Sequence, residues 1–206
     1  MISTEKKPVR KQRKVPEYLI YEIMDGKPIY YRNYKSVLNR TKKFEDIIGS
    51  SALQGLLVSF IAGVLHKFLK EKEYWIMLNE TGLHLDHRNN LAGDILVYEK
   101  SRLKGTDINT NYLQVPANIA IEIDTKADLS ILTFQQYLKL KTTKLHNFGV
   151  DKVIWILTAT RQVIVALPQQ DWLIIDWNKD IEIIGAVSFN IGKYLQENGI
   201  ELQDNL

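Results

Sequence analysis

The segment EIDTK, residues 122–126, places two acids and a lysine at alternate positions behind an apolar run. Side chains alternate between the two faces of a strand, so Glu122, Asp124 and Lys126 are expected in one row on one face. Such a row is either a solvated strand face or a site that holds a cation or a phosphate. Because two acids spaced two residues apart are common, the spacing alone leaves both interpretations open.

A further acid, Asp94, stands at the start of the strand-like run DILVYE, directly after an Ala-Gly pair. Its carboxylate is therefore expected at the end of a strand. If this strand pairs with the one that carries Glu122, the two acids can converge, and oxygen ligands of this kind suit Mg²⁺ or Mn²⁺. A nearby lysine, Lys126 by spacing or Lys141 on the following helix, would supply the positive charge that a phosphate requires.

The composition indicates an ordinary soluble protein. Of the 206 residues, 45% are hydrophobic and 25% are charged, which is typical of globular chains. The chain has no cysteine, which excludes disulfides and thiolate chemistry and is compatible with the reducing cytoplasm, the expected location. The longest apolar stretch, residues 52–65, is shorter than the roughly 20 residues that a membrane span needs, so we expect a buried helix and no membrane partner.

The net charge of +3 is unevenly distributed. Residues 1–14 hold six Lys or Arg against one Glu, a net charge of +5, so the remaining chain carries −2. Residues 1–16 are therefore predicted to form a basic, disordered tail, and residues 17–206 a single folded domain. The tail could neutralise nucleic-acid phosphates or simply keep the protein soluble.

Strand-like runs occur in three parts of the chain. Residues 17–31 contain two such runs joined by Asp25-Gly26, a pair that favours a β-hairpin. YWIMLNE, TGLHLD and DILVYE are predicted as separate short strands, followed by a loop over residues 101–115. Near the end of the chain, VDKVIWILT and RQVIVALP are predicted as an antiparallel pair, and WLIIDW as a further strand.

Hydrophobic periodicity predicts the helices. A long amphipathic helix is expected over residues 51–71, opened by a serine pair that suits capping. A second is expected over residues 130–147, capped by Asp128 or Ser130 and ended by Gly149. SFNIGKYLQENG is predicted to hold a last helix. Helices set against a mixed sheet predict an α/β (α+β) layered domain.

Four segments occur in this order along the chain: YEIMDGKPIYY, NLAGDILVYE, PANIAIEIDTKADLS and KTTKLHNFGVDKVIWILT. Together they resemble the Uma-type family of restriction-endonuclease-like proteins, a branch of the PD-(D/E)xK nuclease superfamily. The resemblance spans about residues 17–168, and its several motifs in order are more specific than any one of them. The family's elements fall on Asp25-Gly26, Asp94, Pro116 with Glu122, Lys141, and Gly149-Val150 with Trp155.

The resemblance implies a restriction-endonuclease-like fold, a mixed β-sheet flanked by helices with an N-terminal β-hairpin. It also implies a Mg²⁺-dependent endonuclease that hydrolyses phosphodiester bonds in DNA. Asp94, Glu122 and Asp124, with the carbonyl of residue 123, would hold Mg²⁺ or Mn²⁺, which activates water and stabilises charge on the phosphate. Double-stranded DNA is the expected partner, and a homodimer is expected because cutting both strands needs two sites.

Two positions depart from the family pattern. Gly93 replaces the proline before the first acid, a change that still suits a turn into a strand. Asp124 stands two residues after Glu122, where the superfamily has its lysine. Lys126 restores that spacing relative to Asp124, so Lys126 and Lys141 both remain candidates for the active-site lysine. Asp124 also keeps open a second hypothesis, a catalytically inactive nuclease-fold protein that binds nucleic acid or a protein partner.

Other polar residues have simpler interpretations. Gln54 lies where the superfamily can place an active-site polar residue, but a polar helix start also accounts for it. Glu22, beside the hairpin turn, is expected to be exposed. His84, Asp86 and His87 could bind a metal, but only the first two share a strand face, so a surface strand end is favoured.

Overall fold

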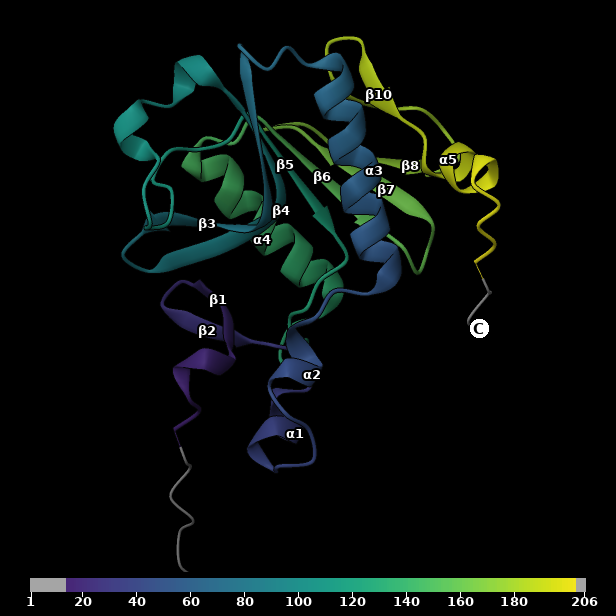
Figure 1. The fold of residues 1–206 in the computed structure, drawn as a ribbon. Helices are drawn as coiled ribbons and strands as arrows, with labels where there is room; N and C mark the ends of the chain where they lie inside the picture. Colours follow the sequence, from purple (N-terminus) through teal and green to yellow (C-terminus); the bar gives the residue numbers. More distant parts are fainter. Residues whose placement is uncertain (1–13, 203–206) are drawn as a thin grey trace, which may run out of the picture.

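The computed structural model describes residues 14–202 of the chain. The predicted basic tail, residues 1–16, lies almost entirely outside these described residues, so its disorder stays a prediction. Within the described part, the chain forms a large mixed sheet, a small two-stranded sheet and helices on both faces of the large sheet (Figure 1).

The large sheet has the strand order β2-β1-β4-β5-β6-β7-β8, and β3 pairs with β4 outside this path. β5 and β6 pair in parallel, whereas the other neighbours in the sheet pair antiparallel. Its strands are β1 (Ile20–Met24), β2 (Lys27–Tyr30), β3 (Tyr74–Asp86), β4 (Asn89–Glu99), β5 (Ile119–Ile123), β6 (Lys152–Leu157), β7 (Gln162–Ala166) and β8 (Leu173–Asp176).

The helices surround this sheet, and β9 (Ile181–Ile184) and β10 (Val187–Phe189) form the small one. No helix in the range 14–202 is long and apolar enough to cross a membrane. The α-helices are α1 (Tyr34–Leu38), α2 (Glu45–Ile48), α3 (Ala52–Phe68), α4 (Phe134–Phe148) and α5 (Ile191–Glu197), and short 3₁₀ helices cover Glu17–Leu19, Lys100–Arg102 and Gly105–Asp107.

Two apolar layers hold α3 and α4 on opposite faces of the large sheet (Figure 1). Leu57 and Ile61 of α3 pack in one buried cluster with Ile121 of β5. Leu138 of α4 packs in the other cluster with Ala120, the neighbour of Ile121 on the same strand. Since adjacent strand residues point to opposite faces, β5 is buried on both sides. The predicted fold class, a mixed sheet flanked by helices, is confirmed.

Several local predictions are also confirmed. β1 and β2 form the N-terminal hairpin, and both turn residues, Asp25 and Gly26, have positive φ angles of 54° and 72°. The side chain of Ser51 caps α3 by accepting a hydrogen bond from the backbone N–H of Gln54 at 3.1 Å. Gly149 ends α4 with φ 115°, the left-handed conformation that glycine adopts without strain.

The start of α4 differs from its prediction. The helix begins at Phe134, because Thr133 and Gln136 form a reciprocal capping box there. The expected caps, Asp128 and Ser130, bond to each other instead, in a turn that precedes the helix. A residue that suits capping therefore does not by itself fix where a helix starts.

YWIMLNE and TGLHLD were expected as separate strands but form one, β3. A β-bulge interrupts it at Asn79 and Glu80, which have positive φ angles of 68° and 53°. The pairing of β3 with β4 resumes on either side of position 94, so the bulge lies opposite Asp94. Bulges of this kind bend a strand and redirect a side chain.

Candidate active site

The prediction that the charged residues of EIDTK form one row on a strand face is wrong, because β5 ends at Ile123. Asp124 has a left-handed φ of 55°, which breaks the alternation. Its carboxylate accepts hydrogen bonds from the backbone N–H of Thr158 at 2.9 Å and from the Thr158 hydroxyl at 2.6 Å. Lys126 forms an ion pair with Glu80 of the β3 bulge. Glu122 alone of the three stays on the strand face, and only 2% of its surface is exposed, so the solvated-face interpretation is wrong for it.

Asp94 was expected at the end of a strand, but it lies in the middle of β4, opposite the end of β5 that carries Glu122. β4 and β5 pair antiparallel with Ile95 opposite Ile121, and the Oδ2 atom of Asp94 accepts a 2.7 Å hydrogen bond from the backbone N–H of Ile123. The convergence of these two acids from β4 and β5 is therefore present in the structure.

The start of α3 also reaches this point. The side-chain amide of Gln54 donates to the Oδ1 atom of Asp94 at 3.3 Å, and Gln54 is itself buried. Gln54 was interpreted as an ordinary polar helix start, and the structure adds this contact with the acid.

Asp94 sits where the alternation of β4 slips. Leu91 and Leu96 pack in the same apolar cluster although they are five positions apart, so one step of the alternation is lost between them. Gly93, which replaces a proline of the family pattern, was expected in a turn before the strand. It lies instead within the strand, where this step of the alternation is lost. A Cβ atom at Gly93 would lie 2.5 Å from Leu96 and 3.6 Å from the Oε1 atom of Glu122, so the backbone passes close to the acid.

Lys141 is the lysine that contacts these acids. Its ammonium nitrogen lies 2.9 Å from Oε2 of Glu122, 2.8 Å from Oε1 of Glu22 and 2.8 Å from the carbonyl oxygen of Ala92. An ammonium group has three protons, so each of them has an acceptor. Lys141 is fully buried on the inner face of α4, whereas Lys126 pairs elsewhere.

Glu22 was expected to be exposed, and this prediction is wrong. Only 2% of its surface is exposed. Its Oε1 atom pairs with Lys141, and its Oε2 atom accepts a 2.7 Å hydrogen bond from the hydroxyl of Tyr137, one turn before Lys141 on α4. The sequence holds one usable signal, because Glu22 and the buried Met24 are two residues apart and must share a strand face.

Burial dominates the electrostatics of this site. It raises the pKa of Glu122 to about 8, and the charges of Asp94 and Glu22 act in the same direction, although Lys141 opposes them. Burial likewise raises the pKa of Asp94. Burial favours a lower pKa for Lys141, but the charges of Glu122 and Glu22 outweigh it and hold that pKa well above its ordinary value. Lys141 is therefore a permanent cation.

The two acids fit a hard divalent cation that keeps several water ligands. The Oε1 atom of Glu122 is buried and has no hydrogen-bond partner within the described residues, which is a costly state for a carboxylate oxygen. A cation shared with Asp94 would satisfy it, and Mg²⁺ is commonly bound through one or two carboxylates. Over residues 14–202, no group of three His, Cys, Asp or Glu is placed to hold a metal, so Asp124 does not complete the expected set of three.

His84 and Asp86 belong to a strand end, as expected. The Nδ1 atom of His84 lies 2.6 Å from the side-chain oxygen of Asn90, and Asp86 accepts from the side chain of Asn89 and the backbone of Arg88. These contacts are those of an ordinary turn between β3 and β4.

The large mixed sheet, with α3 and α4 on its two faces, defines an α/β fold in which helices flank the sheet. The chain is similar to the crystal structure of a putative nuclease belonging to DUF820 from Anabaena variabilis, with a TM-score of 0.56 and 20% sequence identity. The similarity covers 79% of this chain and 80% of that chain. At this identity it establishes the fold. No family model and no curated protein matches the sequence.

Proposed function

We propose that the protein is a Mg²⁺- or Mn²⁺-dependent endonuclease that hydrolyses phosphodiester bonds in DNA. The observation that carries the proposal is the meeting of Asp94, Glu122 and Lys141 beside the end of β5, with one oxygen of the Glu122 carboxylate lacking a partner among the described residues. The fold supports it, because the similar structure is described as a putative nuclease belonging to DUF820.

In the proposed mechanism, Asp94 and Glu122 hold the cation. When bound, a divalent cation lowers the pKa of water and stabilises the negative charge that develops on the phosphate. The backbone N–H of Ile123 and the amide of Gln54 fix the orientation of Asp94. Such supporting contacts keep ligands in place before the cation arrives.

Lys141 acts as a fixed positive charge and not as a base, because its pKa is held well above the ordinary value. Its second carboxylate partner, Glu22, matters here. If Glu122 turns toward a cation, Glu22 still neutralises Lys141 within the buried network. The carbonyl oxygen of Ala92, which accepts from Lys141, and the hydroxyl of Tyr137, which donates to Glu22, hold this pair in place.

The proposed partner is double-stranded DNA, and the proposed assembly is a homodimer. A single site of this kind has one set of ligands for one scissile phosphate. Cleavage of both strands therefore calls for two copies of the chain, each placing its own Asp94 and Glu122 at one strand.

Cleavage of supercoiled plasmid with Mg²⁺ or Mn²⁺ tests the proposal. Wild type should nick the plasmid, and chelation of the cation should stop it. Asp94→Asn and Glu122→Gln, which keep the shape of each side chain, should each lower the rate by about 100-fold or more because they remove a cation ligand. Agarose-gel time courses measure the rates.

Asp124→Asn is the matched control for these two variants. Asparagine tolerates the left-handed backbone at this position, and the Asp124 carboxylate is engaged by Thr158. This variant should keep its rate within about tenfold of wild type, since it removes no proposed ligand. Unchanged cleavage in Asp94→Asn and Glu122→Gln would end the assignment of the site, and equal losses in all three variants would return Asp124 to the ligand set.

The choice between the two lysines is tested by Lys126→Ala. Lys126 is held by Glu80 and makes no ion pair with Asp94 or Glu122. Its removal should change the plasmid cleavage rate by no more than about threefold, an effect too small for a residue that acts only in the transition state. A loss comparable with that of Glu122→Gln would instead assign the active-site charge to Lys126.

The burial of Lys141 favours one alternative function, a catalytically inactive nuclease-fold protein that binds nucleic acid or a protein partner. All three of its ammonium protons are bonded inside the protein, and Asp124 stands where the superfamily has its lysine. Plasmid binding without cleavage under both cations would favour this alternative.

A further inference from the structure

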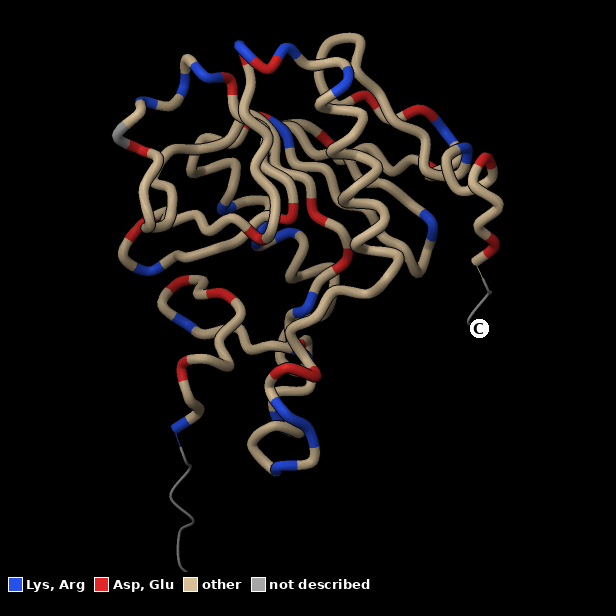
Figure 2. The backbone as a smooth tube through the Cα atoms, viewed as in Figure 1, with Lys and Arg blue, Asp and Glu red and all other residues tan. Residues whose placement is uncertain are grey.

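The first part of the segment between β2 and α3 carries only positive charges, and the acids Glu45 and Asp46 follow in α2. Every charged residue from 32 to 43 is basic, and we call these residues the basic arm. Figure 2 shows them as a blue-marked loop around α1, at the end of the molecule near the hairpin. All of its charged side chains are exposed, namely Arg32, Lys35, Arg40, Lys42 and Lys43.

The start of the basic arm is attached next to the candidate active site. At its start, the backbone N–H of Arg32 donates to the carbonyl of Lys126 at 2.6 Å, and its guanidinium donates to the carbonyl of Thr125. Both carbonyls follow Glu122 by a few residues. After the arm, the chain passes through α2 before it enters α3, where Gln54 donates to Asp94. The arm therefore starts beside the segment that follows Glu122, and the chain after it returns to Asp94.

Aromatic packing holds the arm against the body of the protein. Tyr34 at the start of α1 stacks on Tyr30 of β2, with ring centroids 4.6 Å apart and an angle of 24° between the rings. Just after the arm, Phe44 meets Tyr31 edge-on at 5.9 Å and Tyr18 at 5.2 Å. Stacking and edge-to-face contacts of this kind add stability beyond simple burial. The arm thus has a defined path while its charges face solvent.

The cations of the arm differ from other cations near the site. Lys126, Lys141 and Lys144 each pair with a carboxylate. Arg40 and Lys42 have no salt bridge with any residue in the described part of the chain, and the same holds for Lys43 and Lys35. Neighbouring like charges without counter-ions repel one another, and a polyanion would relieve this repulsion.

We propose that the basic arm binds the phosphate backbone of duplex DNA and sets the duplex over Asp94 and Glu122. This inference rests on the proposed function and adds the surface that holds the substrate. An exposed basic loop is often only solvated. The attachment of its start beside the segment that follows Glu122, and the return of the chain to Asp94 at the start of α3, favour a role at the site. Contacts with phosphates would position the duplex without reading its sequence.

Binding of a labelled duplex in the presence of a chelator tests the inference without cleavage. A triple variant of the arm should bind the duplex at least about tenfold more weakly than wild type at 0.1 M salt. This arm variant combines Arg40→Gln, Lys42→Gln and Lys43→Gln. The slope of log affinity against log salt should become shallower by about 2 to 3, because each lost phosphate contact contributes about 0.9. Fluorescence anisotropy over a salt series gives both values.

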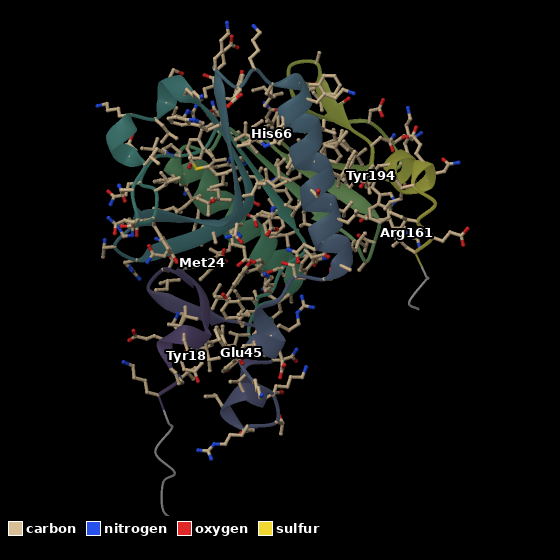
Figure 3. The ribbon with its side chains drawn as sticks, viewed as in Figure 1. Tyr18, Met24, Glu45, His66, Arg161 and Tyr194 are labelled. Atoms are coloured by element: carbon tan, nitrogen blue, oxygen red, sulfur yellow. The ribbon has the colours of Figure 1, made fainter. Side chains whose placement is uncertain are left out.

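A matched control with the same change of charge is the triple variant Lys67→Gln, Lys72→Gln, Lys179→Gln. These lysines are exposed, and Lys67 lies near the opposite end of α3 from Gln54. Figure 3 shows the neighbouring His66 well separated from Glu45, which follows the basic arm. The control should bind the duplex like wild type, because its lysines lie outside the arm. An overall loss of charge would instead weaken binding by both variants equally.

Four results would overturn the inference, and they are distinguishable. Wild-type cleavage together with unaltered duplex binding by the arm variant would remove the arm and leave the nuclease proposal intact. Equal weakening in the arm and control variants would show a non-specific charge effect. If the arm variant lost binding to vesicles of anionic lipid but still bound duplex DNA, the arm would be assigned to a membrane surface. If wild type neither binds nor cleaves duplex, both proposals fall.

Discussion

Lys141→Met should lower the free energy of unfolding by about 3 to 5 kcal/mol, the usual cost of removing one partner from a buried ion pair. Methionine fills much of the space of the lysine but leaves Glu22 and Glu122 without their cation. Both carboxylates are almost completely buried, so neither can recover its lost partner from water. Urea unfolding followed by circular dichroism measures the change through the transition midpoint.

Two further variants separate lost charge from lost packing. Lys126→Met removes a lysine whose ion pair with Glu80 is partly exposed, and it should cost less than about 1 kcal/mol. Combining Lys141→Met with Glu22→Gln and Glu122→Gln removes the unpaired charges, so most of the lost stability should return. A triple variant no more stable than Lys141→Met would show that packing, and not charge, explains the loss.

The second large effect concerns pH. The free energy of unfolding of the protein without divalent cations should fall as the pH rises from about 4.5 to about 8. The pKa of Glu122 is raised from 4.5 to about 8, mainly by burial. Between these values the folded protein keeps a proton that the unfolded chain releases, so raising the pH favours unfolding. The raised pKa of Asp94 acts in the same direction.

Urea titrations at several pH values check this prediction. Glu122→Gln has no proton to lose at this position, so its stability should depend less steeply on pH. Asp25 and Asp86 do not obscure the effect, because their pKa values are lowered and their contribution lies below pH 4.5. Adding Mg²⁺ should restore more stability at pH 8 than at pH 6, since the cation competes with the proton for Glu122. Identical pH dependence in wild type and Glu122→Gln would contradict the assignment.

Local chemistry made several elements predictable. The turn pair Asp25-Gly26 defined the hairpin, and the apolar periodicity of residues 51–71 defined α3 to within three residues at its C-terminal end. Asp94, Glu122 and, as one of two candidate lysines, Lys141 were predicted from motifs that resemble those of a known family, and the structure brings these three together. Their roles in cleavage stay predictions.

Other features depended on contacts between distant parts of the chain. Nothing in the apolar pattern of EIDTK marks the end of β5 at Ile123, because the left-handed turn at Asp124 is held by Thr158 of a later segment. The pairing of Lys126 depends on the bulge that presents Glu80. Glu22 could be buried only because Lys141 neutralises it, and the sequence near Glu22 contains no sign of that lysine.

The buried network around Lys141 also constrains when the site can form during folding. It joins β1, β4, β5 and α4, and the bond between Tyr137 and Glu22 spans 115 residues. Contacts of such long sequence separation are slow to form, because a large loop must close first. A chain still emerging from the ribosome therefore cannot assemble the pair of acids with their lysine until α4 has been made and has docked. Any cleavage activity would be acquired only with the completed fold.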